Sequence, residues 1–167
     1  RHMENPVDPA GLVGFTRLAG VSVEQQNAQC LECHSTGGRI HWAGSAHEVQ
    51  EVACSDCHNP MSRTSRRALL RGRSVHETCF ACHDRRMFAQ KFTHPESMEC
   101  ATCHEPHGSG NRGLLPDKQV ALCSTCHDPA QSHTHPYQEP AQDPRTGEPV
   151  VCTSCHNPHG TSHEQLL

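Results

Sequence analysis

The sequence predicts a mostly irregular fold with short α-helices and essentially no sheet. Hydrophobic residues make up 34 % of the 167-residue chain and aromatic residues 4 %, too little apolar side chain for an ordinary core of this length. Twelve prolines and twelve glycines interrupt regular structure along the chain. All twelve cysteines lie in six Cys-x-x-Cys-His motifs. Such a chain depends on covalent or metal bonds to hold its shape.

The six motifs predict attachment of c-type haem. In such a motif both thiols form thioethers with the porphyrin vinyl groups, and the adjacent histidine becomes the proximal iron ligand. Zinc ribbons and disulfides also use paired cysteines, but neither requires a histidine after every second cysteine. The predicted attachment residues are Cys30, Cys33, Cys54, Cys57, Cys79, Cys82, Cys100, Cys103, Cys123, Cys126, Cys152 and Cys155, and the proximal ligands are His34, His58, His83, His104, His127 and His156.

Six covalently attached haem c groups would change what the core is made of. Each porphyrin is a large apolar disc bonded to the chain, so the sequence predicts a haem-cored fold in which the polypeptide wraps its cofactors. Twelve thioether bonds and the axial iron bonds replace the missing side-chain core. We therefore expect the protein not to fold without haem.

Short helices are expected at the motifs, because Cys-x-x-Cys-His spreads its thiols and histidine over about one helical turn. The clearest candidates are residues 24–34 (EQQNAQCLECH) and 76–90 (HETCFACHDRRMFAQ). A third helix is predicted over residues 64–72 (TSRRALLRG), with its Leu-Leu pair packed on a haem edge.

The motifs belong to a longer repeat, which predicts three tandem di-haem units after an N-terminal arm at residues 1–29. We call residues 30–70, 71–115 and 116–167 the first, second and third repeat. Each contains two motifs, a histidine between them, and a ligand-type residue three positions after the second proximal histidine. The third repeat has an insertion at residues 137–149, predicted to be a surface loop, and a docking role for it is an open hypothesis.

Histidines beyond the six proximal ones are the candidates for the second axial position of each iron. His107 lies three residues after His104, about one helical turn away and on the same side of that haem, so it must ligate a different haem. The same argument applies to His159 after His156. The histidines between paired motifs reach a distal face of their own or a neighbouring haem; they are His47, His94 and His135.

The pattern breaks at the sixth distal ligand, because Met61 stands where the other repeats have His107 and His159. Methionine is a competent axial ligand, and it also packs well against apolar groups. We favour His76, which has no counterpart in the other repeats and lies three residues before Cys79. The alternatives are Met61, His41, His133 and a neighbouring molecule's His2.

Charge is unevenly distributed along the chain. The formal net charge is −4, and six oxidised bis-histidine haems would take it to about −10, which argues against a nucleic-acid partner. Residues 63–73 (RTSRRALLRGR) nevertheless contain five arginines and no acid. These arginines either line a solvated helix face and pair with haem propionates, or form a docking patch for an acidic redox partner.

The location follows from the cofactor, since haem is attached to such motifs outside the cytoplasmic membrane. We expect an exported protein, periplasmic or extracellular at the cell surface, that does not itself span a membrane, because no apolar run approaches about 20 residues. Whether residues 1–3 are native is left open.

Residues 30–167 resemble the multihaem c-type cytochromes of bacterial respiration that carry doubled CxxCH motifs. The resemblance rests on CxxCHxPHG and on WAGSAHEVQEVACSDCH before the second motif. It extends to the periplasmic decahaem conduits of metal- and sulfoxide-reducing bacteria and to the pentahaem donor to nitrite reductase. It implies bis-histidine haems in a row, no catalysis, and other cytochromes or an outer-membrane conduit as redox partners. Six motifs, Met61 and the insertion depart from those patterns.

Electron transfer is the function these observations favour, because an iron with two axial ligands has no position left for a substrate. We expect low potentials suited to anaerobic respiration or extracellular electron transfer. One alternative is a multihaem reductase with one open haem, often marked by CxxCK, which this sequence lacks. Another is a homo-oligomer or filament in which His2 ligates a neighbour's haem.

Overall fold

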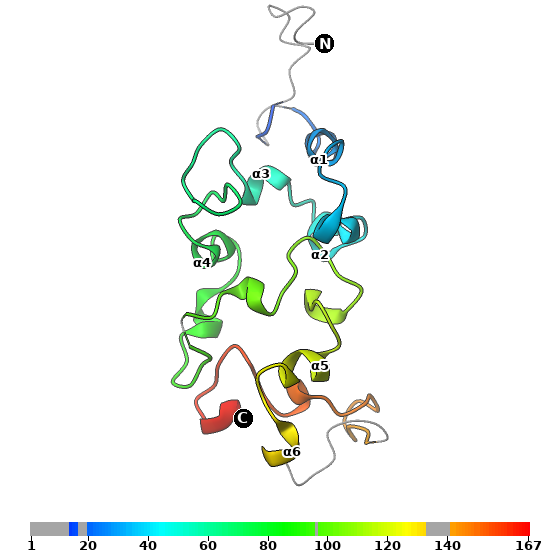
Figure 1. Ribbon diagram of the computed structural model, residues 1–167, viewed down its shortest axis with the longest axis vertical. Coiled ribbons are helices and arrows are strands. Elements are labelled where there is room, and N and C mark those ends of the chain that lie inside the picture. Colours follow the sequence, from blue (N-terminus) through cyan, green and yellow to red (C-terminus); the bar gives the residue numbers. More distant parts are fainter. Residues whose placement is uncertain (1–13, 17–19, 96, 133–140) are drawn as a thin grey trace, which may run out of the picture. The chain divides into compact units, whose positions relative to one another are not determined.

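A computed structural model describes residues 14–16, 20–95, 97–132 and 141–167. In these ranges the chain is mostly irregular, with short helices and no sheet, which confirms the predicted secondary structure (Figure 1). The α-helices are α1 (Val23–Leu31), α2 (Ala46–Val49), α3 (Cys54–Cys57), α4 (Val75–Cys79), α5 (Gln119–Ser124) and α6 (Pro129–Ser132). The 3₁₀ turns are η3 (Gly37–His41), η4 (Arg85–Phe88), η5 (Cys100–Thr102), η6 (Arg112–Leu114), η7 (Cys152–Ser154) and η8 (Glu164–Leu166).

The chain divides into two compact units. The N-terminal unit comprises Arg1–Cys79 with Pro106–Ser109, and the C-terminal unit comprises Phe80–Glu105 with Gly110–Leu167. The motifs at Cys30 and Cys54 belong to the first, and those at Cys100, Cys123 and Cys152 to the second. The division into three di-haem repeats stays a prediction.

Every CxxCH motif begins inside a helical element, as the motif spacing predicts. The first cysteine of each motif lies in α1, α3, α4, η5, α5 or η7. In five motifs the histidine N–H donates to the carbonyl of the first cysteine, over N···O distances of 2.9–3.0 Å at His34, His58, His104, His127 and His156. Helix α1 also has a complete capping box, formed by Ser22 and Gln25. The motif is therefore a closed helical turn that presents thiols and imidazole together.

The helix predicted over residues 64–72 is wrong. Ala68 and Leu69 have φ angles of 53° and 51°, in the left-handed region that no right-handed helix tolerates. Leu69 is 40 % exposed, so it does not pack into a side-chain core. The helix predicted over residues 76–90 is also interrupted: α4 ends at Cys79, residues 80–82 form a turn, and the chain is helical again only in η4 (Arg85–Phe88). There the Asp84 side chain accepts from the Arg86 N–H.

Few apolar side chains are buried in the described part of the chain. The buried hydrophobic residues there are Trp42, at 7 % exposure, and Ala53, at 2 %. The buried polar residues there are Gln26, Asn27, Ser45, Ser65 and Asp143, and the glycines Gly108 and Gly160 are buried as well. Protein side chains alone therefore supply little hydrophobic stabilisation, as the composition predicts.

The described part of the insertion, residues 141–149, is a tight surface turn. Gln142 and Pro149 form an isolated β-bridge across it. Asp143 forms a 2.6 Å ion pair with Arg145, which also donates to the Ser154 carbonyl at 2.8 Å. Residues 142 and 144–149 are exposed, which confirms a surface loop over this part; residues 137–140 lie outside the described ranges.

Among the described residues no helix is both long and apolar enough to cross a bilayer.

Candidate haem-binding site

The second proximal histidine of each repeat is held by a backbone carbonyl. The Nδ1 atoms of His58, His104 and His156 each lie 2.7 Å from a carbonyl oxygen, those of Ala68, Gly113 and Gln165 respectively. A carbonyl only accepts, so Nδ1 carries the proton and donates. The lone pair is then on Nε2, which is the atom that can bind a metal, and the hydrogen bond makes that nitrogen a stronger ligand.

A left-handed backbone turn delivers each of these carbonyls. In all three repeats the residue that accepts from the histidine and the leucine after it have positive φ. That leucine also accepts a backbone hydrogen bond from the residue after the histidine, at 2.7–2.8 Å; the pairs are Asn59 and Leu69, Glu105 and Leu114, and Asn157 and Leu166. The repeated Leu-Leu pair in the sequence therefore marks a ligand-orienting turn, a role that sequence reasoning missed.

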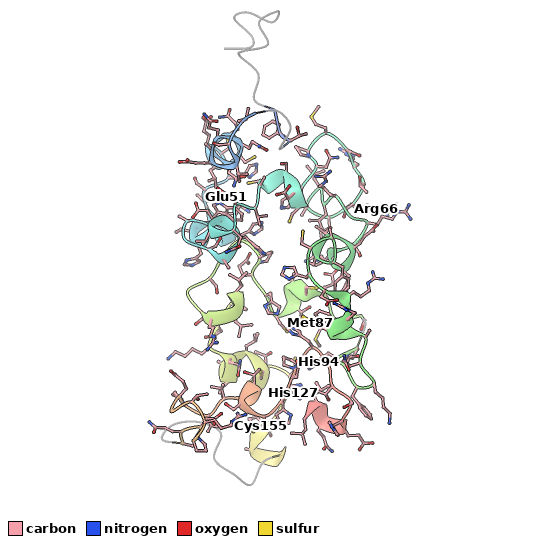
Figure 2. The ribbon with its side chains drawn as sticks, turned by 180° about the vertical axis from the view of Figure 1, so that it is seen from behind. Glu51, Arg66, Met87, His94, His127 and Cys155 are labelled. Atoms are coloured by element: carbon pink, nitrogen blue, oxygen red, sulfur yellow. The ribbon has the colours of Figure 1, made fainter. Side chains whose placement is uncertain are left out.

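Three proximal histidines each face a histidine from elsewhere in the chain. The ring centres of His58 and His107 are 6.0 Å apart and the planes are nearly parallel, at 12°. Those of His104 and His159 are 5.8 Å apart at 31°. The His94 and His127 rings, labelled in Figure 2, are 6.1 Å apart at 66°. The first pair lies in the N-terminal unit and the other two in the C-terminal unit.

These separations suit an iron between two imidazoles. Two metal–nitrogen bonds of about 2 Å, plus the distance from each nitrogen to its ring centre, add up to roughly 6 Å. Ordinary aromatic pairs span similar distances. These three pairs differ from ordinary aromatic pairs in the residues that form them: each joins one CxxCH histidine to one histidine from outside the motifs. None of the twelve cysteines is tied up in a disulfide, so the thiols that haem c requires are present.

The pairs also bear on which histidine serves which haem. His107 faces His58, not the neighbouring His104, and His159 faces His104, not the neighbouring His156. Both arrangements support the argument that a histidine three residues after a proximal ligand serves another haem. His94 faces His127, the first proximal histidine of the third repeat.

The segment Pro-His-Gly after two of the motifs touches a second histidine. His47 Nδ1 donates to the Pro106 carbonyl at 2.7 Å, and His94 Nδ1 donates to the Pro158 carbonyl at 2.8 Å. In each case the proline directly precedes a histidine that faces a proximal ligand. One prolyl carbonyl thus orients one spare histidine while the next residue presents another.

The glycine of Pro-His-Gly is required by this close approach. Gly108 has φ +115°, and a Cβ placed there would overlap the His41 carbonyl oxygen. Gly160 has φ +140°, and its Cβ would lie 2.8 Å from Thr93 Cγ2, beside His94. A side chain at either position would push the Pro-His-Gly segment away from the chain that carries the other histidine.

In the first and third repeats, the first cysteines of the two motifs lie close together. Burial, with Cys30 close by, raises the pKa of the Cys54 thiol to about 11, and burial with Cys152 close by does the same for the pKa of Cys123. A side-chain amide joins each pair of motifs: Asn27 Oδ1 accepts from the Cys54 N–H at 2.8 Å, and Gln119 Oε1 from the Thr153 N–H at 3.0 Å. Sequence reasoning missed both amides, whose only signal was a polar residue three or four positions before a motif.

Burial lowers the pKa of His159, with His104 and then His94 as smaller contributors. The neutral imidazole that this favours is the form that binds a metal.

The remaining candidate ligands in the described residues differ in how exposed they are. His76 is half-buried in α4, His41 is exposed in η3, and Met61 is 92 % exposed. His2, His133 and His135 lie outside the described residues. The choice of sixth ligand, and the distal partners of His34, His83 and His156, therefore stay predictions.

Comparison with known proteins agrees with the motif analysis. The family model for the doubled CXXCH motif matches residues 47–88 and 94–132. The chain is also 31 % identical over 103 residues to a protein of Shewanella baltica (strain OS185) named multiheme cytochrome MtrA, covering 59 % of this chain and 30 % of that relative. It therefore spans less than a third of the relative's length. The motifs, the available cysteine thiols and the similarity together identify the chain as a multihaem c-type cytochrome with doubled CXXCH motifs.

Proposed function

We propose that this chain binds six haem c groups in three di-haem repeats, mostly with two histidines on each iron, and carries electrons between other redox proteins. When bound, each haem iron supplies reversible one-electron chemistry. The chain's own residues attach the haem, fill both axial positions and so keep substrates off the metal.

The observation that carries this proposal is the three facing histidine pairs. Each joins a CxxCH histidine to a histidine from another segment, at 5.8–6.1 Å between ring centres. A reductase needs an open axial position for its substrate, whereas a filled pair leaves only electron exchange at the porphyrin edge. The pairs therefore favour transfer over catalysis.

For the cellular role we propose an exported protein, in the periplasm or at the cell surface, in anaerobic respiration or extracellular electron transfer. The similarity to a multiheme cytochrome supports other cytochromes as partners. Dense propionate charge and histidine ligation favour low potentials.

The test is the oxidised holoprotein. Intact mass should exceed that of the polypeptide by six haem groups, one for each motif. Electron paramagnetic resonance should show low-spin iron throughout. A stoichiometric high-spin signal would instead indicate a haem with an open position and support the reductase alternative.

A further inference from the structure

The loop after the second motif of the first repeat has an unusual surface. Five arginines and no acid lie between residues 63 and 73, in a chain whose formal net charge is −4. Arg63 and Arg66 are exposed, and Figure 2 shows the Arg66 side chain extending away from the ribbon. Met61 and Leu69, at 92 % and 40 % exposure, add apolar surface. Basic side chains interspersed with exposed apolar ones are typical of a protein-docking surface.

This loop is bonded directly to the attachment site at Cys54 and Cys57. The Ala68 carbonyl accepts from His58 Nδ1 at 2.7 Å, and the Arg71 N–H donates to the Cys57 carbonyl at 2.8 Å. The Arg71 side chain also donates to the Ser55 carbonyl at 3.1 Å. Anything that binds the loop therefore lies beside that haem site.

The arginines are not needed to hold the histidine. The corresponding loops after His104 and His156 form the same 2.7 Å histidine–carbonyl bond with a single arginine, Arg112, and with none. Pairing with propionates does not explain the difference either. Every haem carries two propionates, so that role would call for arginines in all three loops.

A recess in the loop suits an acidic side chain. Arg63, Ser65, Arg66 and Leu69 line a cavity of about 320 Å³. The guanidinium groups of the two arginines that line it match a carboxylate in charge and in hydrogen-bond geometry.

We propose that residues 61–73 dock an acidic redox protein, with Arg63 and Arg66 receiving its carboxylates, so that electrons enter or leave at the haem attached to Cys54 and Cys57. This inference rests on the proposed electron-transfer function. Basic patches of this kind act mainly on the association rate, which electrostatic steering raises roughly 10- to 1,000-fold at low ionic strength.

The experiment uses the holoprotein and reduced flavodoxin, an acidic one-electron donor, as the probe. Stopped-flow haem reduction is followed at low and high salt for the wild type, R63E/R66E and the milder R63Q/R66Q. We expect the low-salt second-order rate constant to fall about tenfold or more in the charge-reversal variant and less in the glutamine variant. Both variants should lose most of the salt dependence. R112E, in the corresponding loop of the second repeat, is the matched control and should stay within about twofold of the wild type.

An unchanged rate in R63E/R66E, or an equal loss in R112E, would overturn the docking proposal. Reduction of the wild type by dithionite but not by flavodoxin would also overturn the docking proposal. The proposed electron-transfer function would then still stand. If the substitutions shift a haem potential or release haem while the flavodoxin rate keeps its salt dependence, the arginines pair with propionates and the proposal is wrong. Failure of the proposed function would appear separately, as high-spin iron in the wild type.

Discussion

In the first and second repeats, a loop follows the second motif. The two loops share one structural feature and differ in another. Both return to their proximal histidine through a left-handed turn, from Ala68 to His58 and from Gly113 to His104. Only the second continues from its motif into Pro-His-Gly, which presents His107 to His58. Holding a motif histidine and presenting a second histidine to another motif are therefore separate features of these loops.

The two Pro-His-Gly histidines face in the same direction along the sequence. His107 of the second repeat faces a proximal histidine of the first, and His159 of the third faces one of the second. The Pro-His-Gly histidine therefore faces the preceding repeat in both cases. Met61 stands at the equivalent position of the first repeat. Its loop is occupied instead by arginines.

The largest effect should come from removing the His107 side chain. His107→Ala should keep all six haems, because attachment uses only the motifs, but should turn one haem high-spin. We expect that haem to be the one at Cys54 and Cys57, since His107 faces His58. Electron paramagnetic resonance measures the change.

The site is assigned by adding His107→Ala to a variant that lacks Cys54 and Cys57, where no further high-spin signal should appear. Met61→Ala, at the equivalent position of the first repeat, is the matched control and should remain low-spin. A high-spin haem at Cys100 and Cys103 instead would show that His107 serves its own haem.

Next in size is the glycine of Pro-His-Gly. Gly108→Ala should lower the free energy of unfolding by about 3 kcal/mol, because its Cβ meets a backbone carbonyl that cannot yield. Gly160→Ala should cost less, about 1–2 kcal/mol, because a side chain is in the way. Thermal melts of the holoprotein give the order. Gly110, where an added Cβ would meet nothing within 4 Å, is the control. Equal effects at all three positions would contradict the close approach.

A smaller effect on stability is expected from the left-handed turns that hold His58 and His104. Gly113→Ala should destabilise the second repeat by about 1 kcal/mol, since the left-handed conformation at φ 72° is unfavourable for alanine. Ala68→Gly should relieve that cost in the first repeat, offset in part by glycine's greater freedom when unfolded. Denaturant titration followed at the haem absorption measures both. Changes of the same sign in the two variants would argue against the shared turn.

The smallest effect should be at Met61. Its side chain is 92 % exposed, so we expect Met61→Ala to leave the spectrum unchanged, and the wild type to lack the weak sulfur-to-iron band near the red edge of the visible range. That band in the wild type, lost in Met61→Ala, would make Met61 the sixth ligand and His76 the wrong choice.

The sequence alone determined the local features of the motifs themselves. The six CxxCH motifs, the helical turn at each of them and the surplus of histidines follow from residues a few positions apart, and the lack of sheet in the described ranges follows from composition. Even the prediction that His107 serves another haem needed only the pitch of one helical turn.

Tertiary structure decided which distant segments meet. That His107 faces His58, or that a prolyl carbonyl holds His94, depends on how chain segments dozens of residues apart return to each other, and no local spacing encodes it. The helix wrongly predicted at residues 64–72 fails because of a contact over a shorter separation, ten residues from His58 to Ala68. Its propensity is helical, but a carbonyl must turn back to His58, and Ala68 and Leu69 adopt positive φ to deliver it. The helix propensity of this segment is therefore overridden by the hydrogen bond between the Ala68 carbonyl and His58.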